Sequence, residues 1–188
     1  DSINNGAYDN ATGVAMMLEV ARAFARSSLR PKRTLIFLAV TGEEKGLQGS
    51  DYFARHPLPG GEGLEVVGNI NLDMVLMLRP ITTVIAFGAE HTSLGPQLEK
   101  AAGLTGLKVV ADPMPEEVIF VRSDQFSFVK EGVPAIFPVS ALDDSEAARA
   151  ENQRWRVDRY HSPSDDMSQV FDWKSGATFT RMAFLTTW

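Results

Sequence analysis

Apolar residues follow two different patterns along this chain. In one pattern they return every three or four residues, as Val14, Met17 and Ala21 do, and this spacing is typical of a helix with one buried face. In the other they form a short continuous run, such as TLIFLAV at 34–40. A run of this kind is typical of a strand that is buried on both faces of a sheet. The chain is therefore expected to alternate helices with strands.

The two patterns predict the positions of the elements. Helices are expected at about 12–27, 46–55, 94–102 and 124–131, as a turn at 146–151, and from 172 to the end. Strands are expected at 34–40, 66–74, 84–87, 108–111 and 135–139. This alternation indicates an α/β fold of three layers, with helices on both faces of a mixed, mostly parallel sheet. No repeat or linker divides the chain, so residues 1–188 are expected to form a single domain.

The composition narrows the classes of function. The net charge is −6 and the 18 Lys and Arg residues are scattered, so the basic face of a nucleic-acid-binding protein is not expected. The chain contains no cysteine, so any metal must be bound by His, Asp or Glu side chains. No apolar run reaches the roughly 18 residues that a membrane span needs, and no membrane span is expected in this chain.

Residue types that bind metals stand beside several predicted elements. Glu43 and Glu44 follow the run TLIFLAV, Asp9 precedes the first helix, and His161 lies in the polar segment before the last helix. Each of these residues alone has an ordinary explanation as a helix cap, a solvated pair or a surface histidine. Asp73 is less ordinary, because it interrupts the apolar segment INLDMVLML, where a charge is costly to bury without a partner.

Five segments together resemble one family. They are GAYDNATGVA (6–15), TGEEKGLQGS (41–50), NINLDM (69–74), RSDQFSF (122–128) and RYHSPSDD (159–166). In this order they resemble the zinc-dependent exopeptidases typified by bacterial leucyl aminopeptidase, which include glutamate-carboxypeptidase-like members. The resemblance covers nearly the whole chain. It implies the α/β fold of these enzymes, a peptide substrate, and hydrolysis of a terminal peptide bond, with the amino end favoured.

The resemblance also assigns roles to the five residues. It implies that Asp9 bridges two zinc ions, that Glu44 and His161 bind the first, and that Asp73 binds the second. It implies that Glu43 is the general base. Two zinc ions sharing a water lower the pKa of that water from 15.7 toward about 7 and polarise the scissile carbonyl. A neighbouring carboxylate then moves the proton to the leaving amine.

The chain departs from the family pattern at the second zinc. The family supplies a further His ligand from an H-x-D segment upstream of the bridging Asp, and no His precedes Asp9 here. We therefore expect that the domain is truncated at its N-terminus, that strands of the sheet are missing with that segment, and that this chain alone binds the second metal weakly.

Further positions near the motifs leave alternatives open. Phe120 stands where some aminopeptidases of this type have a Tyr, and it cannot donate a hydrogen bond to an oxyanion. Arg122 or Tyr160 is the alternative donor, and Phe120 is expected to serve packing. Ser123 and Asp124 match the family's Ser-Asp pair, and the resemblance implies that they belong to the wall of the site. Ser123 also has the position of an N-cap for the helix at 124–131, which is the alternative explanation. Asp165 is expected either to orient the ligand loop or to stabilise a turn.

Two other functions compete with the peptidase. A related glutaminyl cyclase, an acyltransferase with one zinc, would use only Asp9, Glu44 and His161. A non-catalytic homologue would use the fold for binding, but such members lose ligands or the base. The presence of Asp73 and Glu43 favours the peptidase. A periplasmic or secreted location is expected by analogy only, and the oligomeric state is left open.

Overall fold

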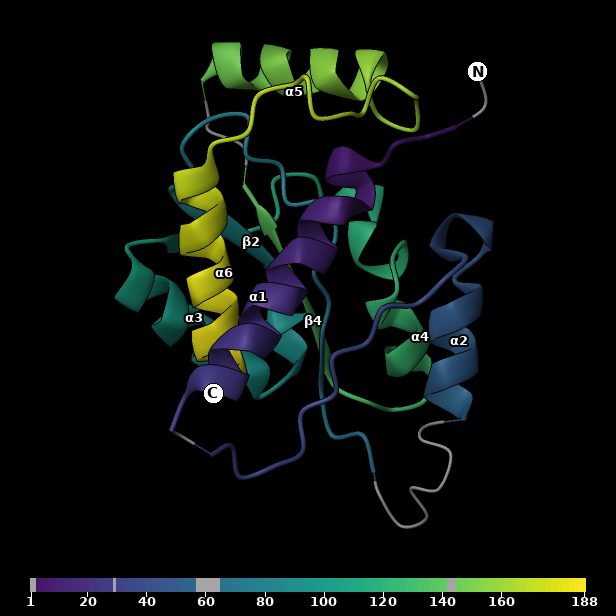
Figure 1. The fold of residues 1–188 in the computed structure, drawn as a ribbon, viewed down its shortest axis with the longest axis vertical. Coiled ribbons are helices and arrows are strands. Elements are labelled where there is room, and N and C mark those ends of the chain that lie inside the picture. The colour runs from purple at the N-terminus through teal and green to yellow at the C-terminus, as the bar shows by residue number, and fades with distance from the viewer. Residues whose placement is uncertain (1–2, 29, 57–64, 142–144) are drawn as a thin grey trace.

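A computed structural model gives the fold of this chain (Figure 1). It describes residues 3–28, 30–56, 65–141 and 145–188. The helices are α1 (Gly13–Arg26), α2 (Gln48–Arg55), α3 (Leu94–Thr105), α4 (Gln125–Lys130), α5 (Glu146–Asp158) and α6 (Trp173–Thr187). The strands are β1 (Asn69–Ile70), β2 (Thr83–Phe87), β3 (Lys108–Val110) and β4 (Ala135–Ser140).

The four strands form one mixed sheet in the order β1-β4-β2-β3. β1 is parallel to β4, β2 is antiparallel to β4, and β3 is parallel to β2. Helix α6 packs against both α1 and α3, whereas α2 packs against α4, and α5 lies across one end of the molecule (Figure 1). This arrangement confirms the expected α/β fold with a mixed, mostly parallel sheet.

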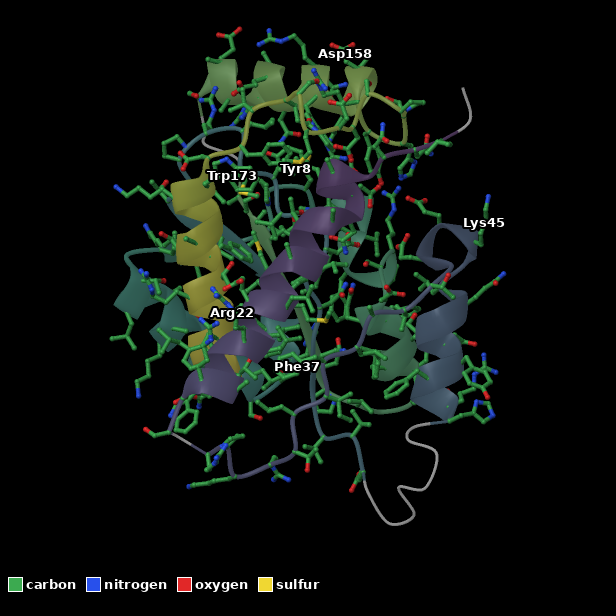
Figure 2. The ribbon with its side chains drawn as sticks, in the orientation of Figure 1. Tyr8, Arg22, Phe37, Lys45, Asp158 and Trp173 are labelled. Carbon is green, nitrogen blue, oxygen red and sulfur yellow. The ribbon has the colours of Figure 1, made fainter. Side chains whose placement is uncertain are left out.

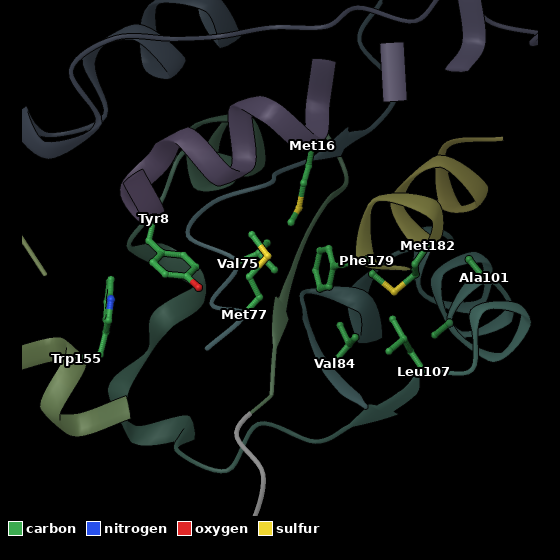
Figure 3. Packing of buried hydrophobic residues seen from close by; sticks show 11 residues of the cluster. Tyr8, Met16, Val75, Met77, Val84, Ala101, Leu107, Trp155, Phe179 and Met182 are labelled. Carbon is green, nitrogen blue, oxygen red and sulfur yellow. The ribbon is translucent and has the colours of Figure 1, made fainter. Parts of the chain in front are cut away.

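The main hydrophobic core connects the helices to the sheet (Figure 3). Phe179 and Met182 of α6 and Val84 of β2 are fully buried in it. Tyr8 is also fully buried, stacks on Phe171 with ring centroids 4.6 Å apart, and donates a hydrogen bond from its hydroxyl to a backbone carbonyl oxygen at 2.8 Å. Because Tyr8 immediately precedes Asp9, the core fixes the chain at the edge of the candidate site.

The segment 34–40 differs from its prediction. It is extended, but it pairs with no other strand among the described residues. Leu35 packs against a cluster on α1 and α6, while Ile36 and Phe37 are 42% and 37% exposed. Burial on both faces needs a neighbouring layer on each side, and the described part of the chain supplies only the helical one.

Two other elements have different lengths from those expected. The strand predicted at 66–74 is reduced to β1, because the chain leaves the sheet after Asn71, whose N–H donates to Ile136 O at 3.0 Å. The turn expected at 146–151 extends to Asp158 as α5. Ser145 caps this helix by accepting a hydrogen bond from the Ala148 N–H, and Trp155 anchors it in the core. None of the described helices is long and apolar enough to cross a membrane.

Candidate metal centre

Asp9 lies in a helical turn, Ala7–Thr12, that leads into α1. The backbone of Asp9 is not helical, with φ −111° and ψ 88°, so its side chain leaves the direction of the helix. Gly6 begins the turn at φ +63°, and a Cβ there would lie 2.5 Å from the carbonyl oxygen of Asp9. A glycine is therefore required at this position for the turn to close around Asp9.

Glu43 and Glu44 lie on the short turn Glu43–Lys45. Gly42 and Gly46 bound this turn with φ +73° and +91°, in the left-handed region that favours glycine. The turn directs the two neighbouring carboxylates to different places, since Glu44 contacts His161 and Glu43 does not belong to that contact.

His161 follows α5 and has a left-handed backbone, with φ +55°. Its Nε2 lies 3.2 Å from Asp9 Oδ2 and 2.7 Å from Glu44 Oε1. The ring of Tyr160 stacks on the imidazole with centroids 3.7 Å apart. The contacts of His161 join three segments of the chain. In Figure 2 these segments are marked by Tyr8 before α1, by Lys45 on the 43–45 turn and by Asp158 at the end of α5.

Three of the predicted ligands therefore come together. Among the described residues, one ligand atom each from Asp9, Glu44 and His161 lies within 4.8 Å of the other two. Zinc ligands at about 2.1 Å in a tetrahedron are separated from one another by about 3.4 Å. The 3.2 Å distance from His161 Nε2 to Asp9 Oδ2 is near this separation, and the 2.7 Å distance to Glu44 Oε1 is that of a direct ion pair. The donor types, two carboxylates and an imidazole within reach of one point, fit a zinc ion.

The charges at the site also fit a cation. The pKa of Asp9 is raised to about 7, mainly by burial and in addition by the negative charges of Asp73 and Glu44, while His161 acts in the opposite direction. A carboxyl group behaves in this way when several acids crowd a partly buried site. A bound divalent cation would compensate this crowding of negative charge.

Asp73 lies beside these three residues but outside the set that they form. Its Oδ2 accepts a hydrogen bond of 2.6 Å from Ser123 Oγ. Burial raises the pKa of Asp73, and the Ser123 hydroxyl acts against this rise. The prediction of Ser123 as an N-cap is wrong, because α4 begins at Gln125 after Asp124, and the hydroxyl of Ser123 bonds to Asp73 instead.

A network of hydrogen bonds holds Ser123, the residue that donates to Asp73. Asn71 Nδ2 donates to Ser123 Oγ at 3.0 Å and to Gln125 Oε1 at 2.8 Å, and Gln125 is fully buried. Neither Asn71 nor Gln125 was a predicted site residue. The signal available in the sequence was the amide residues inside the apolar segments NINLDM and QFSF.

Glu43 is a partly buried acid beside these residues. Burial raises the pKa of its carboxyl group to about 7, and the negative charges of Asp73 and Glu44 contribute in the same direction. An acid with a pKa near neutrality can both accept and release a proton at physiological pH.

Asn10 is a further residue to which the sequence analysis assigned no role. Its Oδ1 accepts from the N–H groups of Gly13 and Met74 at 3.0 and 3.1 Å, and its Nδ2 donates to Leu72 O at 3.1 Å. Asn10 thus joins the segment of Asp9 to the segment of Asp73. Its place in GAYDNATG was visible in the sequence, but two of its partners, Leu72 and Met74, lie more than 60 residues away.

The remaining predicted positions lie around this group. Phe120 packs against the cluster of Ile85, Phe87 and Phe137, as expected for a packing residue. Arg122 is exposed and lies 3.8 Å from a carboxylate oxygen of Glu117.

Comparison with known proteins gives the family. The model described as Peptidase family M28 matches residues 1–187. Leupeptin-inactivating enzyme 1 of Streptomyces exfoliatus is 31% identical over 184 residues, which cover 92% of this chain and 39% of that protein. A probable zinc metalloprotease of Phaeosphaeria nodorum is 44% identical over 71 residues, which cover 38% of this chain and 14% of that protein.

Solved structures agree with this result. The aminopeptidase from Aneurinibacillus sp. strain AM-1 is 25% identical, with a TM-score of 0.67, over 99% of this chain and 40% of its own. The chain thus spans about two fifths of the length of this enzyme and of the Streptomyces relative. The family match over nearly all of the chain confirms the resemblance to zinc-dependent exopeptidases. This chain belongs to peptidase family M28.

Proposed function

We propose that this chain carries the catalytic centre of a zinc aminopeptidase, which removes single residues from the amino end of a peptide. The observation that carries the proposal is the convergence of Asp9, Glu44 and His161 from three separate segments. Family membership supports it. So do the names of two similar proteins, an aminopeptidase and a probable zinc metalloprotease.

In this proposal Asp9, Glu44 and His161 would hold the first zinc ion. Three protein ligands are the number found in catalytic zinc sites, which keep a place for water or substrate. Asp73 would hold a second ion, with Asp9 shared between the two, and the network of Ser123 fixes its orientation. Bound zinc supplies two things, a lowered pKa for water and polarisation of the scissile carbonyl.

Glu43 moves the proton. Its carboxylate takes a proton from the attacking water and delivers it to the nitrogen of the leaving amine. Burial is the largest cause of the raised pKa of Glu43, and a carboxyl group whose pKa is raised by burial is suited to accept a proton and release it again. Because Glu43 lies outside the set formed by Asp9, Glu44 and His161, its oxygens stay available for the proton.

Tyr160 is the better of the two expected donors to the developing oxyanion. Burial, with the negative charges of Asp9 and Glu44, raises the pKa of its phenol to about 12. The hydroxyl therefore keeps its proton at neutral pH and can donate a hydrogen bond. Its ring lies on His161, whereas Arg122 is exposed and directed to Glu117.

The first prediction concerns the activity of the full-length protein. It is expected to hydrolyse amino-acid p-nitroanilides, to lose this activity when a chelator removes zinc, and to regain it when zinc is added. The same substrates with an acetylated amino group should not be cleaved. Cyclisation of an N-terminal glutamine without any peptidase activity would contradict the proposal in favour of an acyltransferase. Zinc binding without turnover of any substrate would contradict it in favour of a binding protein.

A further inference from the structure

Asp165 is a buried acid close to the candidate metal centre. It is 2% exposed, although a buried carboxylate is costly unless hydrogen bonds satisfy it. The carboxylate accepts from the backbone N–H of Tyr8, at 3.0 and 3.1 Å from its two oxygens, and from the N–H of Asp9 at 3.0 Å. It also accepts from Gln169 Nε2 at 2.5 Å. The side chain is therefore aimed at the turn that carries Asp9.

The backbone of Asp165 bonds both to the turn that carries Asp9 and to the loop that follows His161. Its carbonyl oxygen accepts from the Ala7 N–H at 3.0 Å, and its own N–H donates to Ser162 O at 3.1 Å. Asp165 thus holds Ala7, Tyr8 and Asp9 through three N–H groups, and it closes a tight turn that starts directly after His161. One residue joins the segments of two candidate ligands.

This connection matters because regular secondary structure fixes neither ligand. Asp9 has non-helical dihedral angles inside its turn, and His161 has a left-handed backbone. Ligands on such segments need neighbouring contacts to hold their geometry. The 3.2 Å distance between Asp9 Oδ2 and His161 Nε2 spans the two segments that Asp165 connects.

We propose that Asp165 is a positioning residue, which sets Asp9 opposite His161 through the backbone N–H groups of Tyr8 and Asp9. The affinity for zinc depends on it beyond its effect on folding. This inference rests on the proposed function, since it concerns the same metal centre. Asp165 itself is not a member of the ligand set and acts through Asp9.

The neighbouring residue Asp166 provides a matched control. Its Oδ1 accepts hydrogen bonds from the N–H and hydroxyl of Ser168 and lies 3.8 Å from Arg159. These contacts are local to the loop, and none of them reaches the turn of Asp9. A substitution at Asp166 therefore changes an acid of the same loop without changing the connection.

The test compares Asp165→Asn with Asp166→Asn in the full-length protein. The asparagine keeps one acceptor oxygen and replaces the other with an NH₂ group. Because both carboxylate oxygens lie within 3.1 Å of a backbone N–H, either orientation of the amide places NH₂ against an N–H donor, and at least one of these hydrogen bonds is lost. We expect the dissociation constant for zinc, measured by competition with a chelating dye, to rise about 10- to 100-fold in Asp165→Asn. In Asp166→Asn it should stay within about twofold of the wild-type value, since loss of such local contacts leaves the ligands in place.

The thermal midpoint separates positioning from folding. If Asp165 positions Asp9, the rise in midpoint that zinc produces is smaller in Asp165→Asn than in the wild type. If Asp165 only supports the fold, the midpoint falls equally with and without zinc, the dissociation constant is unchanged, and the proposal is overturned. Should Asp165→Asn fail to fold, Gln169→Ala removes the side-chain donor to Asp165 together with the acceptor of the Trp155 indole N–H. A smaller rise in the dissociation constant is then expected, and the midpoint of the zinc-free variant reports the loss of the Trp155 contact separately.

Two failures remain distinguishable. If the wild-type protein binds zinc, Glu44→Gln abolishes that binding, and both Asp165→Asn and Gln169→Ala bind zinc like the wild type, only the role of Asp165 is refuted. If the wild-type protein does not bind zinc, the proposed function itself is refuted, and the inference with it.

Discussion

Replacement of Glu43 by glutamine is expected to lower kcat of the full-length protein by about 10²- to 10⁴-fold. Glutamine keeps the size and shape of the side chain but cannot take a proton from the attacking water. The loss should fall on kcat more than on KM, because the missing transfer belongs to the chemical step. Zinc content should stay at the wild-type level, since Glu43 is outside the ligand set.

A control shows whether the effect is specific to the site. Glu99→Gln removes an exposed acid from α3, and its kcat should match that of the wild type. Initial rates with an amino-acid p-nitroanilide, together with metal analysis of each variant, provide the measurement. If Glu43→Gln kept full activity, the assignment of the general base would be wrong.

Gly13→Ala is expected to lower the free energy of unfolding by about 3 kcal/mol, at the upper end of the usual cost of overpacking. Gly13 is the first residue of α1, and a Cβ there would lie 2.0 Å from Leu72 O and 2.4 Å from Asn10 Oδ1. The nearer atom belongs to the backbone, so it cannot move aside as a flexible side chain can. The substitution forces apart the two segments that carry Asp9 and Asp73.

Gly103→Ala is the matched control for this substitution. Gly103 lies in α3, and a Cβ there meets nothing within 4 Å. Alanine at such a position should raise the free energy of unfolding by about 0.5–1 kcal/mol, because glycine is the poorer helix former. Urea unfolding of both variants gives the comparison. Equal stability of the two would show that α1 does not approach Leu72 closely.

The sequence predicted most of the helices and strands because their patterns are local. The spacing of apolar residues identified α1 and α3 within a few residues of their ends. The run at 34–40 misled the prediction, because an apolar run reports what a strand could bury and not whether neighbouring layers are present. The described residues cover one face of it, and Ile36 and Phe37 are partly exposed.

The candidate site was also predicted in part, namely in its ligand residues and not in the partners that hold them. Residue types and motif order predicted Asp9, Glu44 and His161, and the structure brings them together. The contacts that hold ligands in place were not predictable, because they join residues far apart in sequence. Asp165 bonds to Asp9 across 156 positions, and Ser123 bonds to Asp73 across 50. No local pattern distinguishes such a partner from a helix cap or a turn residue.

The role of Asp73 as a ligand of a second zinc ion stays a prediction. It lies outside the three-residue set, is held by Ser123, and raises the pKa of Asp9 through its negative charge. These contacts place its charge near Asp9, as a shared second metal requires. The first zinc site is therefore the part of the proposal that the geometry supports most directly.

One measurement tests that site most directly, a crystal structure of the zinc-loaded protein with anomalous scattering recorded at the zinc absorption edge. The account predicts an anomalous peak at about 2.0–2.2 Å from one carboxylate oxygen each of Asp9 and Glu44 and from a ring nitrogen of His161. Zinc bound elsewhere, with these three side chains free of metal, would contradict it.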